Sequence, residues 1–208
     1  EQEIMNLNYS IIESLSTAIE FRSGESGEHV KRIRRLTQLL LEELCRNKRG
    51  EYCFSDKEIQ EIAQASILHD VGKIAISDLI LNKPGRLTAQ EFEIMKSHTV
   101  MGCQVLEQIP QYKNNKLYQY AYDICRHHHE RWDGRGYPDG LKGKEITIWS
   151  QVVSVADVFD ALTNKRVYQP AIPVPEALAM IETGQCGAFN PELLGALKKI
   201  LPRINTGV

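Results

Sequence analysis

The chain lacks several features that would place it in a common class of protein. Its five cysteines are scattered and form no Cys-x-x-Cys pair, so neither a disulfide framework nor a thiolate zinc site is indicated, and a reducing cytoplasm is the expected location. No apolar run approaches the roughly 20 residues that a membrane helix requires, and the first residues show no secretory signal. A net charge of -2 over 208 residues provides no broad basic surface, which argues against DNA binding.

The period-two alternation that is typical of half-buried strands is also missing, and apolar residues recur instead at helical spacing. Two long helices are predicted near the start, over 4–19 and 30–44, and a further stripe runs over 117–128. With 42% apolar and 25% charged residues and no internal linker, the composition predicts one compact all-α domain. The predicted helix starts are Ser55 with Glu58, Thr88 with Glu91, and Asn190 with Pro191.

One predicted helix, over 152–162, is apolar on nearly every face and yet contains two carboxylates, Asp157 and Asp160. An apolar pattern of this kind is typical of a helix that is buried on all sides. A carboxylate in such surroundings stays ionised only if it is paired, hydrogen-bonded or bound to a metal. Each of the two aspartates therefore needs a partner.

The histidines are the strongest chemical signal, because all but His98 have a carboxylate or another histidine within four residues. A lone histidine is more often a hydrogen-bonded side chain than a ligand, but several together favour a metal site. Glu25 and His29 would share a helix face if the helix runs through residues 26 and 27. Neighbouring side chains on a helix point about 100° apart, so His128 and His129 are expected to reach two ions that flank their helix. Imidazoles with carboxylates and no thiolate favour iron, manganese or magnesium over structural zinc.

Five strings of the sequence resemble, in order, the blocks of the HD-GYP subgroup of HD-domain phosphohydrolases. They are ESGEHVKRI, LHDVGKIAI, LNKPGRLT, HHERWDGRGYP and VADVFDALTNKRVY, and the resemblance covers roughly residues 20 to 195. It implies a single compact helical HD-domain fold with a GYP loop at residues 134–138. Residues 21–208 are then the catalytic domain, and residues 1–20 an N-terminal helix that could link it to an upstream sensor or receiver domain of a longer protein.

The resemblance also implies a centre of two or three divalent ions, with iron or manganese expected first and magnesium, nickel and zinc as the other candidates. Asp70 matches the carboxylate that bridges two ions, and Glu25 matches a ligand of the third. Asp160 is expected to form hydrogen bonds behind the ligands, and His127 is expected outside the ligand set. The implied ligands are Glu25, His29, His69, Asp70, His98, His128, His129 and Asp157.

Further residues match the family's substrate contacts. Lys73 matches a residue that faces the substrate phosphate, where it would stabilise the transition state next to the catalytic Asp70. The other interpretation of Lys73 is a surface lysine that pairs with an acid. Arg166 and Tyr168 occupy the family's RxY element, and Arg166 is expected to contact phosphate or guanine. Gln169 stands where some members have lysine, so one phosphate contact is expected to be missing.

The GYP loop has two interpretations. Tyr137 is expected either to contact substrate or to brace the metal-binding segment. Together with Arg135 it could also form a surface for diguanylate cyclase (GGDEF) domains, as the resemblance implies. The glycines of this loop permit backbone turns that are closed to other residues.

The function that the resemblance implies is hydrolysis of cyclic di-GMP to pGpG by a metal-activated hydroxide, and onward to GMP because Glu25 is present. One alternative is another cyclic dinucleotide or nucleotide, since the metal chemistry does not read the base. A second alternative is a non-catalytic cyclic di-GMP receptor or GGDEF-binding adaptor; the complete ligand set argues against it, and Gln169 argues for it. The first helix could pair with its counterpart in a homodimer, although an ordinary core stripe gives the same pattern.

Overall fold

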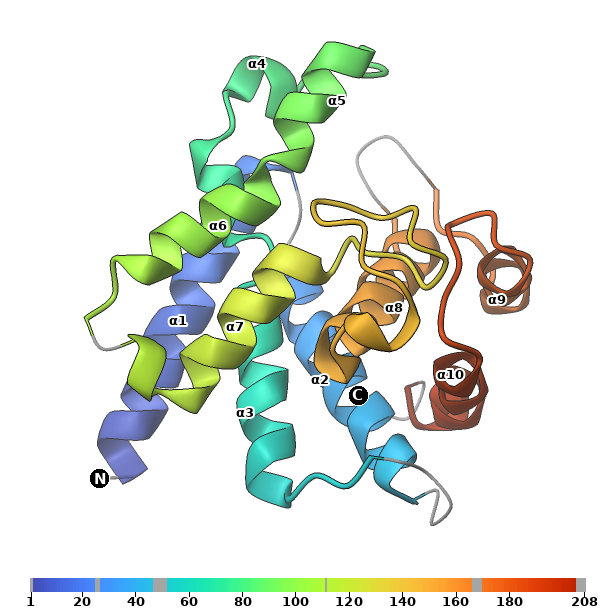
Figure 1. Ribbon diagram of the computed structural model, residues 1–208, viewed down its shortest axis with the longest axis horizontal. Helices are drawn as coiled ribbons and strands as arrows, with labels where there is room; N and C mark the ends of the chain where they lie inside the picture. Colours follow the sequence, from blue (N-terminus) through green and yellow to red (C-terminus); the bar gives the residue numbers. More distant parts are fainter. Residues whose placement is uncertain (1, 25–26, 47–51, 111, 166–169, 205–208) are drawn as a thin grey trace.

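The computed structural model describes residues 2–24, 27–46, 52–110, 112–165 and 170–204, and helices dominate it (Figure 1). The α-helices of these residues are α1 (Gln2–Arg22), α2 (Gly27–Arg46), α3 (Asp56–Ser66), α4 (Asp78–Leu81), α5 (Ala89–Lys96), α6 (His98–Glu107), α7 (Lys116–His127), α8 (Ile148–Thr163), α9 (Val174–Glu182) and α10 (Pro191–Ile204). Three short 3-10 helices lie between them, η1 (Val71–Ala75), η2 (Tyr112–Asn114) and η3 (Gly143–Glu145). Apart from an isolated bridge between Asp133 and Lys142, the described residues contain no β-structure. The predicted all-α fold is confirmed.

Several helices begin where the sequence supplies a capping side chain. At the start of α3, the Ser55 hydroxyl accepts a hydrogen bond from the backbone N–H of Glu58, and the Glu58 carboxylate accepts one from the backbone N–H of Ser55, which together form a capping box. Thr88 and Glu91 form the same capping box at the start of α5. At α10, Asn190 accepts a backbone hydrogen bond from the first turn. Each cap satisfies an N–H group that a helix start leaves free, so the predicted starts are confirmed.

α2 is the central helix of the fold and packs against α1, α3, α8 and α10. Its side chains Ile33, Leu39 and Leu40 are fully buried. They belong to one hydrophobic cluster with Val152 of α8 and Leu197 of α10. Removal of this apolar surface from water is the main force that holds the helices together. Figure 1 shows α9 and α10 on one side of the molecule and α1 with α6 on the other.

α8 contains the segment that the sequence predicts to be buried. Val152, Val153, Val155 and Ala156 have no exposed surface, and the rest of the helix is covered on most faces.

α8 is only 16 residues long. Within the described part of the chain, every helix is too short or too polar to cross a membrane.

η1 lies directly on α6 because two glycines meet at the contact. A Cβ atom added to Gly72 would stand 1.8 Å from the carbonyl oxygen of His98 and 2.4 Å from the backbone nitrogen of Gly102. No side chain fits in that space. The close approach brings Asp70, which precedes η1, next to His98 at the start of α6. Beyond this contact, α4 and α5 extend from the body of the molecule (top of Figure 1).

Candidate metal centre

Asp70 lies at the middle of a buried group of imidazoles. Its Oδ2 atom is 3.1 Å from Nε2 of His69, and its Oδ1 atom is 3.1 Å from Nε2 of His98 and 3.6 Å from Nε2 of His128. One ligand atom from each of Asp70, His98, His128 and His129 lies within 4.8 Å of the others. Segments that are far apart in the sequence, namely α6 and the turns after α3 and α7, therefore converge at one point.

A second group lies beside the first. The ligand atoms of Glu20, His29 and His69 also lie within 4.8 Å of one another, and all three side chains are buried. Asp157 reaches this group, with its Oδ1 atom 4.0 Å from Nε2 of His29. Because the His69 and Asp70 side chains touch, the two groups form a continuous cluster of nitrogen and oxygen donors.

The imidazoles are oriented in the way that metal binding requires. Nδ1 of His69 hydrogen-bonds to the carbonyl oxygen of Ser66 at 2.9 Å, and Nδ1 of His98 to that of Met95 at 2.7 Å. Nδ1 of His128 hydrogen-bonds in the same way to a carbonyl oxygen of its own helix turn. With Nδ1 engaged by a carbonyl, Nε2 is the ring atom left to bind a metal. The Nε2 atoms of all three rings face Asp70.

Four buried polar atoms of the cluster have no hydrogen-bond partner among the described residues. They are Nε2 of His69, His98 and His128 and Oδ1 of Asp70. Leaving a buried polar atom without a partner is costly, and such atoms need an explanation. Cations at the two groups would satisfy these atoms, His69 in one group and Asp70, His98 and His128 in the other, so the donor set fits divalent metal ions.

The charges of the cluster are arranged around one strongly acidic group. Burial opposes the ionisation of Asp70, but Lys73 and His69 hold its pKa well below the usual value. Burial by itself would lower the pKa of His69, whereas the neighbouring Asp70 raises it to about 9. For His129, burial and the neighbouring His128 and His98 hold the pKa well below its usual value, so that ring is a neutral donor. The centre therefore offers both a carboxylate and neutral imidazole ligands.

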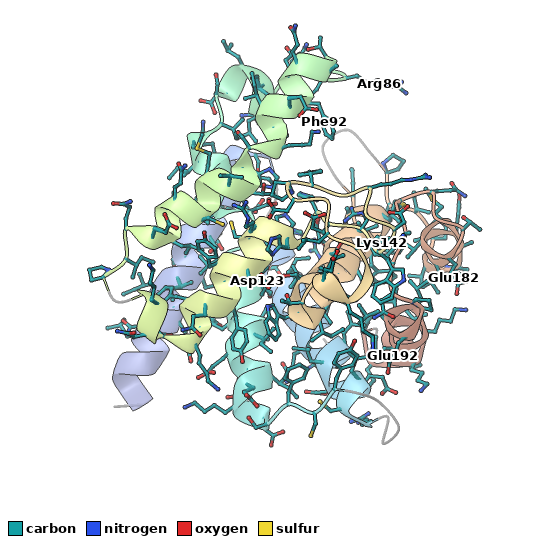
Figure 2. All side chains as sticks on the ribbon, in the orientation of Figure 1. Arg86, Phe92, Asp123, Lys142, Glu182 and Glu192 are labelled. Carbon is teal, nitrogen blue, oxygen red and sulfur yellow. The ribbon has the colours of Figure 1, made fainter. Side chains whose placement is uncertain are left out.

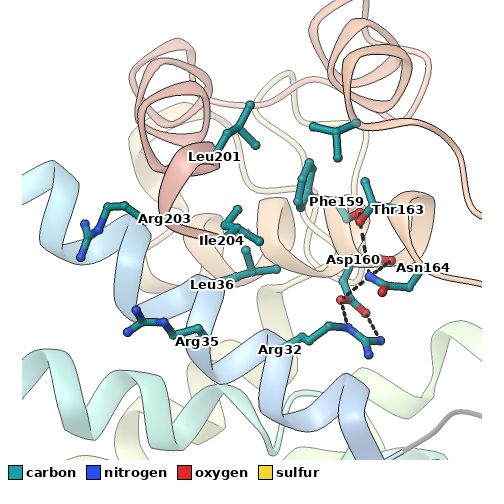
Figure 3. A pocket seen from close by; sticks show the side chains of 11 residues that line it. Arg32, Arg35, Leu36, Phe159, Asp160, Thr163, Asn164, Leu201, Arg203 and Ile204 are labelled. Atoms are coloured by element: carbon teal, nitrogen blue, oxygen red, sulfur yellow. Dashed lines mark hydrogen bonds and ion pairs between the residues drawn. The ribbon is translucent and has the colours of Figure 1, made fainter. Parts of the chain in front are cut away.

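His29 is held by a partner on α8. Its Nδ1 atom lies 2.7 Å from Oδ2 of Asp160, which also accepts hydrogen bonds from Arg32. This carboxylate orients the imidazole ring, as expected for Asp160. Figure 3 shows Asp160 and Arg32 in the wall of a cavity of about 310 Å³ whose lining includes none of the clustered histidines.

The expectation that His128 and His129 belong to a helix is wrong. α7 ends at His127 and is capped by His128. The chain then turns: the N–H of Glu130 bonds to the carbonyl oxygen of His127 at 2.9 Å, and further on the N–H of Trp132 bonds to the carbonyl oxygen of Ala188 at 2.9 Å. The ring centroids of His128 and His129 are only 4.0 Å apart, and both residues belong to the same group around Asp70.

The GYP loop is held against Glu130. The buried carboxylate of Glu130 accepts hydrogen bonds from the backbone N–H groups of Asp139, Gly140 and Leu141 at 2.7 to 3.0 Å. A Cβ at Gly136 would stand 2.3 Å from Cα of Glu130, so the loop passes directly over this residue.

Neighbouring contacts hold the same loop against α7 and the cluster. Both ring nitrogens of His127 bond to aspartates, Asp123 at 2.7 Å and Asp139 at 2.9 Å, which places His127 outside the ligand set. Tyr137 stacks on His129, with ring centroids 4.8 Å apart and an angle of 28° between the planes.

Lys73 points into the cluster. Its Nζ atom lies 2.7 Å from Oδ2 of Asp70 and 3.5 Å from Oε2 of Glu20. Its side chain is 17% exposed, so Lys73 is half-buried and not on the open surface, although it pairs with acids as the other interpretation expected. The buried ammonium group is available beside the donors that could hold metal.

Four residues of the sequence prediction lie outside the described residues, namely Glu25, Arg166, Tyr168 and Gln169. Two functional candidates were missed. Glu20 and Glu130 are each only 2% exposed, and the sequence analysis predicted neither of them as a functional residue. The position of Glu130 directly after the histidine run was the single available signal.

The chain is similar to several known proteins. A family model described as HD domain matches residues 14–193. A cyclic di-GMP phosphodiesterase of Thermotoga maritima is 40% identical over 192 residues, which cover 92% of this chain and 49% of that protein. The 3'3'-cGAMP-specific phosphodiesterase 2 of Vibrio cholerae is 40% identical over 167 residues, 80% of this chain and 30% of that protein. The chain thus spans half or less of the length of these relatives.

The fold is shared with a solved structure, an HDG"Y"P protein from Bdellovibrio bacteriovorus. The TM-score is 0.61 at 24% identity, and the match covers 84% of this chain and 51% of the other. The matched family model spans α2, α6, α7 and α8, which position the histidines and aspartates. With its HD and GYP motifs in place, the chain belongs to the HD-domain family and, within it, to the HD-GYP subgroup.

Proposed function

We propose that this chain is a metal-dependent phosphodiesterase that hydrolyses cyclic di-GMP. The observation that carries the proposal is the buried Asp70 carboxylate, surrounded by imidazoles whose Nε2 atoms lack any other described partner. The names of relatives at 35 to 40% identity, several of them cyclic di-GMP phosphodiesterases, support the same substrate.

The proposed ligands are those of the sequence prediction, and Glu20 is added to them because it lies with His29 and His69. Two or three ions would be held, with Asp70 between two of them, and iron or manganese suits the mixture of imidazole and carboxylate. Bound ions supply Lewis acidity, which lowers the pKa of a water molecule and offsets charge on the phosphate. Asp157 is part of this set, and Glu25 remains proposed as a ligand of a third ion.

Side chains other than the metal ligands are proposed to bind the substrate and to stabilise the transition state. Lys73 is proposed to hold its ammonium group beside the phosphate, where it would stabilise the negative charge that grows during in-line attack. Arg166 and Tyr168 are proposed to bind phosphate or guanine. A cavity of about 390 Å³ lined by His129, Arg131 and Tyr137 offers room for part of a substrate next to the cluster.

A product assay tests the proposal. The chain is purified without oxygen, its metals are measured, and cyclic di-GMP, pGpG and GMP are separated by chromatography. The Asp70→Asn variant should lose both metal and more than about 99% of activity, because a ligand shared by two ions is removed. Glu28→Gln is the control, since Glu28 is exposed and pairs with Lys31 although it precedes His29. Full activity of Asp70→Asn would refute the proposal.

A second substrate class has specific support. The Vibrio cholerae relative named for 3'3'-cGAMP is as similar to this chain, at 40% identity, as the Thermotoga relative named for cyclic di-GMP. Measuring kcat/KM for both dinucleotides with the same preparation decides between them. A preference of more than about tenfold, equivalent to about 1.4 kcal/mol, would assign the substrate.

The proposed setting is a cytoplasmic signalling protein with an upstream sensor or receiver domain. The GYP loop is proposed as the surface for GGDEF domains, and the exposed stripe of Leu7, Ile11 and Leu15 on α1 supports a homodimer. Light scattering tests the dimer. A chain that binds cyclic di-GMP without cleaving it would instead be a receptor or adaptor.

A further inference from the structure

A group of aromatic and cationic side chains continues outward from the metal cluster. Tyr137, which stacks on His129, meets the ring of Phe92 edge to face with centroids 6.3 Å apart. Nζ of Lys96 lies 5.4 Å from the centroid of Phe92 and 5.6 Å from that of Tyr137. We call Phe92, Lys96 and Tyr137 the aromatic ledge. It connects α5 with the GYP loop directly beside His129.

Phe92 is more exposed than its role in folding requires. Its side chain is 46% exposed, and α5 contributes no fully buried residue to the core. Figure 2 labels Phe92 on α5, in the part of the molecule that extends away from the main bundle. α5 is held instead by its capping box and by the pair between Lys83 and Glu91. The aromatic ring is therefore not needed to hold the helix in place.

Lys96 brings positive charge to the same place. Its ammonium group pairs with Glu93 at 2.6 Å, but Glu93 is 71% exposed, and surface pairs of this kind contribute little. A lysine has three N–H donors, and one carboxylate contact leaves others for a ligand. An aromatic face next to an ammonium group is the combination that binds a nucleobase together with its phosphate.

We infer that the aromatic ledge binds one purine base of the substrate by stacking on Phe92, with Lys96 contacting the adjoining phosphate. The inference rests on the proposed function, because it assumes that the scissile phosphate lies over the metal cluster. Tyr137 lies between His129 and Phe92, so a dinucleotide with its phosphate at the cluster would extend its base toward α5. The ledge then determines which phosphodiesters are recognised, while the cluster determines the chemistry.

The test compares a dinucleotide with a phosphodiester that has no purine. In Phe92→Ala, KM for cyclic di-GMP should rise about tenfold with kcat within about twofold, because loss of base stacking weakens binding. Hydrolysis of methyl p-nitrophenyl phosphate should stay at the wild-type rate. Phe92→Tyr keeps an aromatic face and should restore the wild-type KM. Lys96→Gln should raise KM for the dinucleotide as well.

Ile94→Ala is the matched control, because Ile94 is on the same helix and 48% exposed. It should change neither substrate. If Phe92→Ala slows both substrates equally, the ledge only braces the GYP loop, and the inference is overturned. An unchanged KM for cyclic di-GMP would overturn it too.

Binding separates this inference from the proposed function. The dissociation constant of a phosphorothioate analogue of cyclic di-GMP is measured by calorimetry for wild type and Phe92→Ala. If wild type cleaves no dinucleotide but analogue binding weakens about tenfold in Phe92→Ala, the proposed function is wrong, and base binding by the aromatic ledge is supported. If wild type cleaves cyclic di-GMP and analogue binding is unchanged in the variant, the proposed function is supported, and base binding by the aromatic ledge is refuted.

Discussion

At the scale of single residues, the cluster depends on buried charges that balance one another. Burial alone would lower the pKa of Lys73, but the carboxylates of Asp70 and Glu20 raise it above its usual value. The ammonium group therefore stays charged inside the protein, and removal of either carboxylate would leave a buried positive charge with a single partner. Glu20 is thus more than a neighbour of the histidines.

Replacement of Glu20 by glutamine should reduce the metal content and the stability of the protein. The neutral amide keeps the volume of the side chain but loses the charge that faces Lys73 and the His29 and His69 rings. We expect fewer ions per chain and a loss of about 1 to 3 kcal/mol in the free energy of unfolding. Metal analysis and chemical denaturation measure the two effects. Wild-type values for both would rule out a role for Glu20 in the centre.

Glu91 gives a pH dependence with a defined direction. Hydrogen bonds from Lys83 and Thr88 lower its pKa from 4.5 to about 2. A carboxylate with a lowered pKa stabilises the fold above its unfolded value, and this contribution is lost as the pH falls from about 4.5 to about 2. The stability difference between wild type and Glu91→Gln should therefore be largest at neutral pH and shrink across that interval. Denaturant unfolding at several pH values measures this difference. A difference that stays constant with pH would contradict the prediction.

At the scale of elements, the cluster is assembled by close contacts between short segments. η1 and α6 approach until only glycine fits at Gly72, and this contact places Asp70 next to His98. The end of α7 has a similar effect, because the turn after His127 directs both following histidines to the same carboxylate. A change in helix spacing is therefore a change in ligand geometry.

Substitution of Gly72 by alanine should separate η1 from α6. Because the new methyl group would stand 1.8 Å from a carbonyl oxygen, we expect a loss of about 1 to 3 kcal/mol or more in stability, together with lower metal content. Gly195→Ala on α10 is the control, since a Cβ there meets nothing within 4 Å. That variant should gain up to about 1 kcal/mol from helix propensity. Equal stability of the two variants would show that η1 can move without cost.

At the scale of the whole molecule, the candidate metal centre collects donors from segments between α1 and α8. Glu20 comes from α1, the histidines come from the first two thirds of the chain, and Asp157 comes from α8. Ions bound at this point would hold these segments together. Folding stability and metal affinity should therefore be linked.

Removal of metal should lower the melting temperature of the whole domain. For an ion present at about 100 times its dissociation constant, binding contributes about 2.7 kcal/mol, which corresponds to roughly 5 to 10 °C in a chain of this size. Calorimetry before and after treatment with a chelator measures the shift, and addition of manganese should reverse it. If a metal-containing preparation melts at the same temperature after chelation, the ions do not join the segments as described.

The sequence by itself determined the helical class, several helix starts and the family. These features depend on residues that are close together in the chain, such as the Ser55 and Glu58 capping box or the HHERWDGRGYP string. The two residues of a capping box lie only three positions apart, so a short stretch of sequence contains the whole signal for a helix start.

Only the tertiary structure decided which donors meet. Glu20 shows no local sign of burial, and it joins His29 and His69 because α1, α2 and η1 pack together. The path of the chain after α7 likewise involves a distant partner, because the N–H of Trp132 bonds to the carbonyl oxygen of Ala188. Buried polar groups must find partners wherever the packed helices bring them, and the distance along the chain places no limit on that choice.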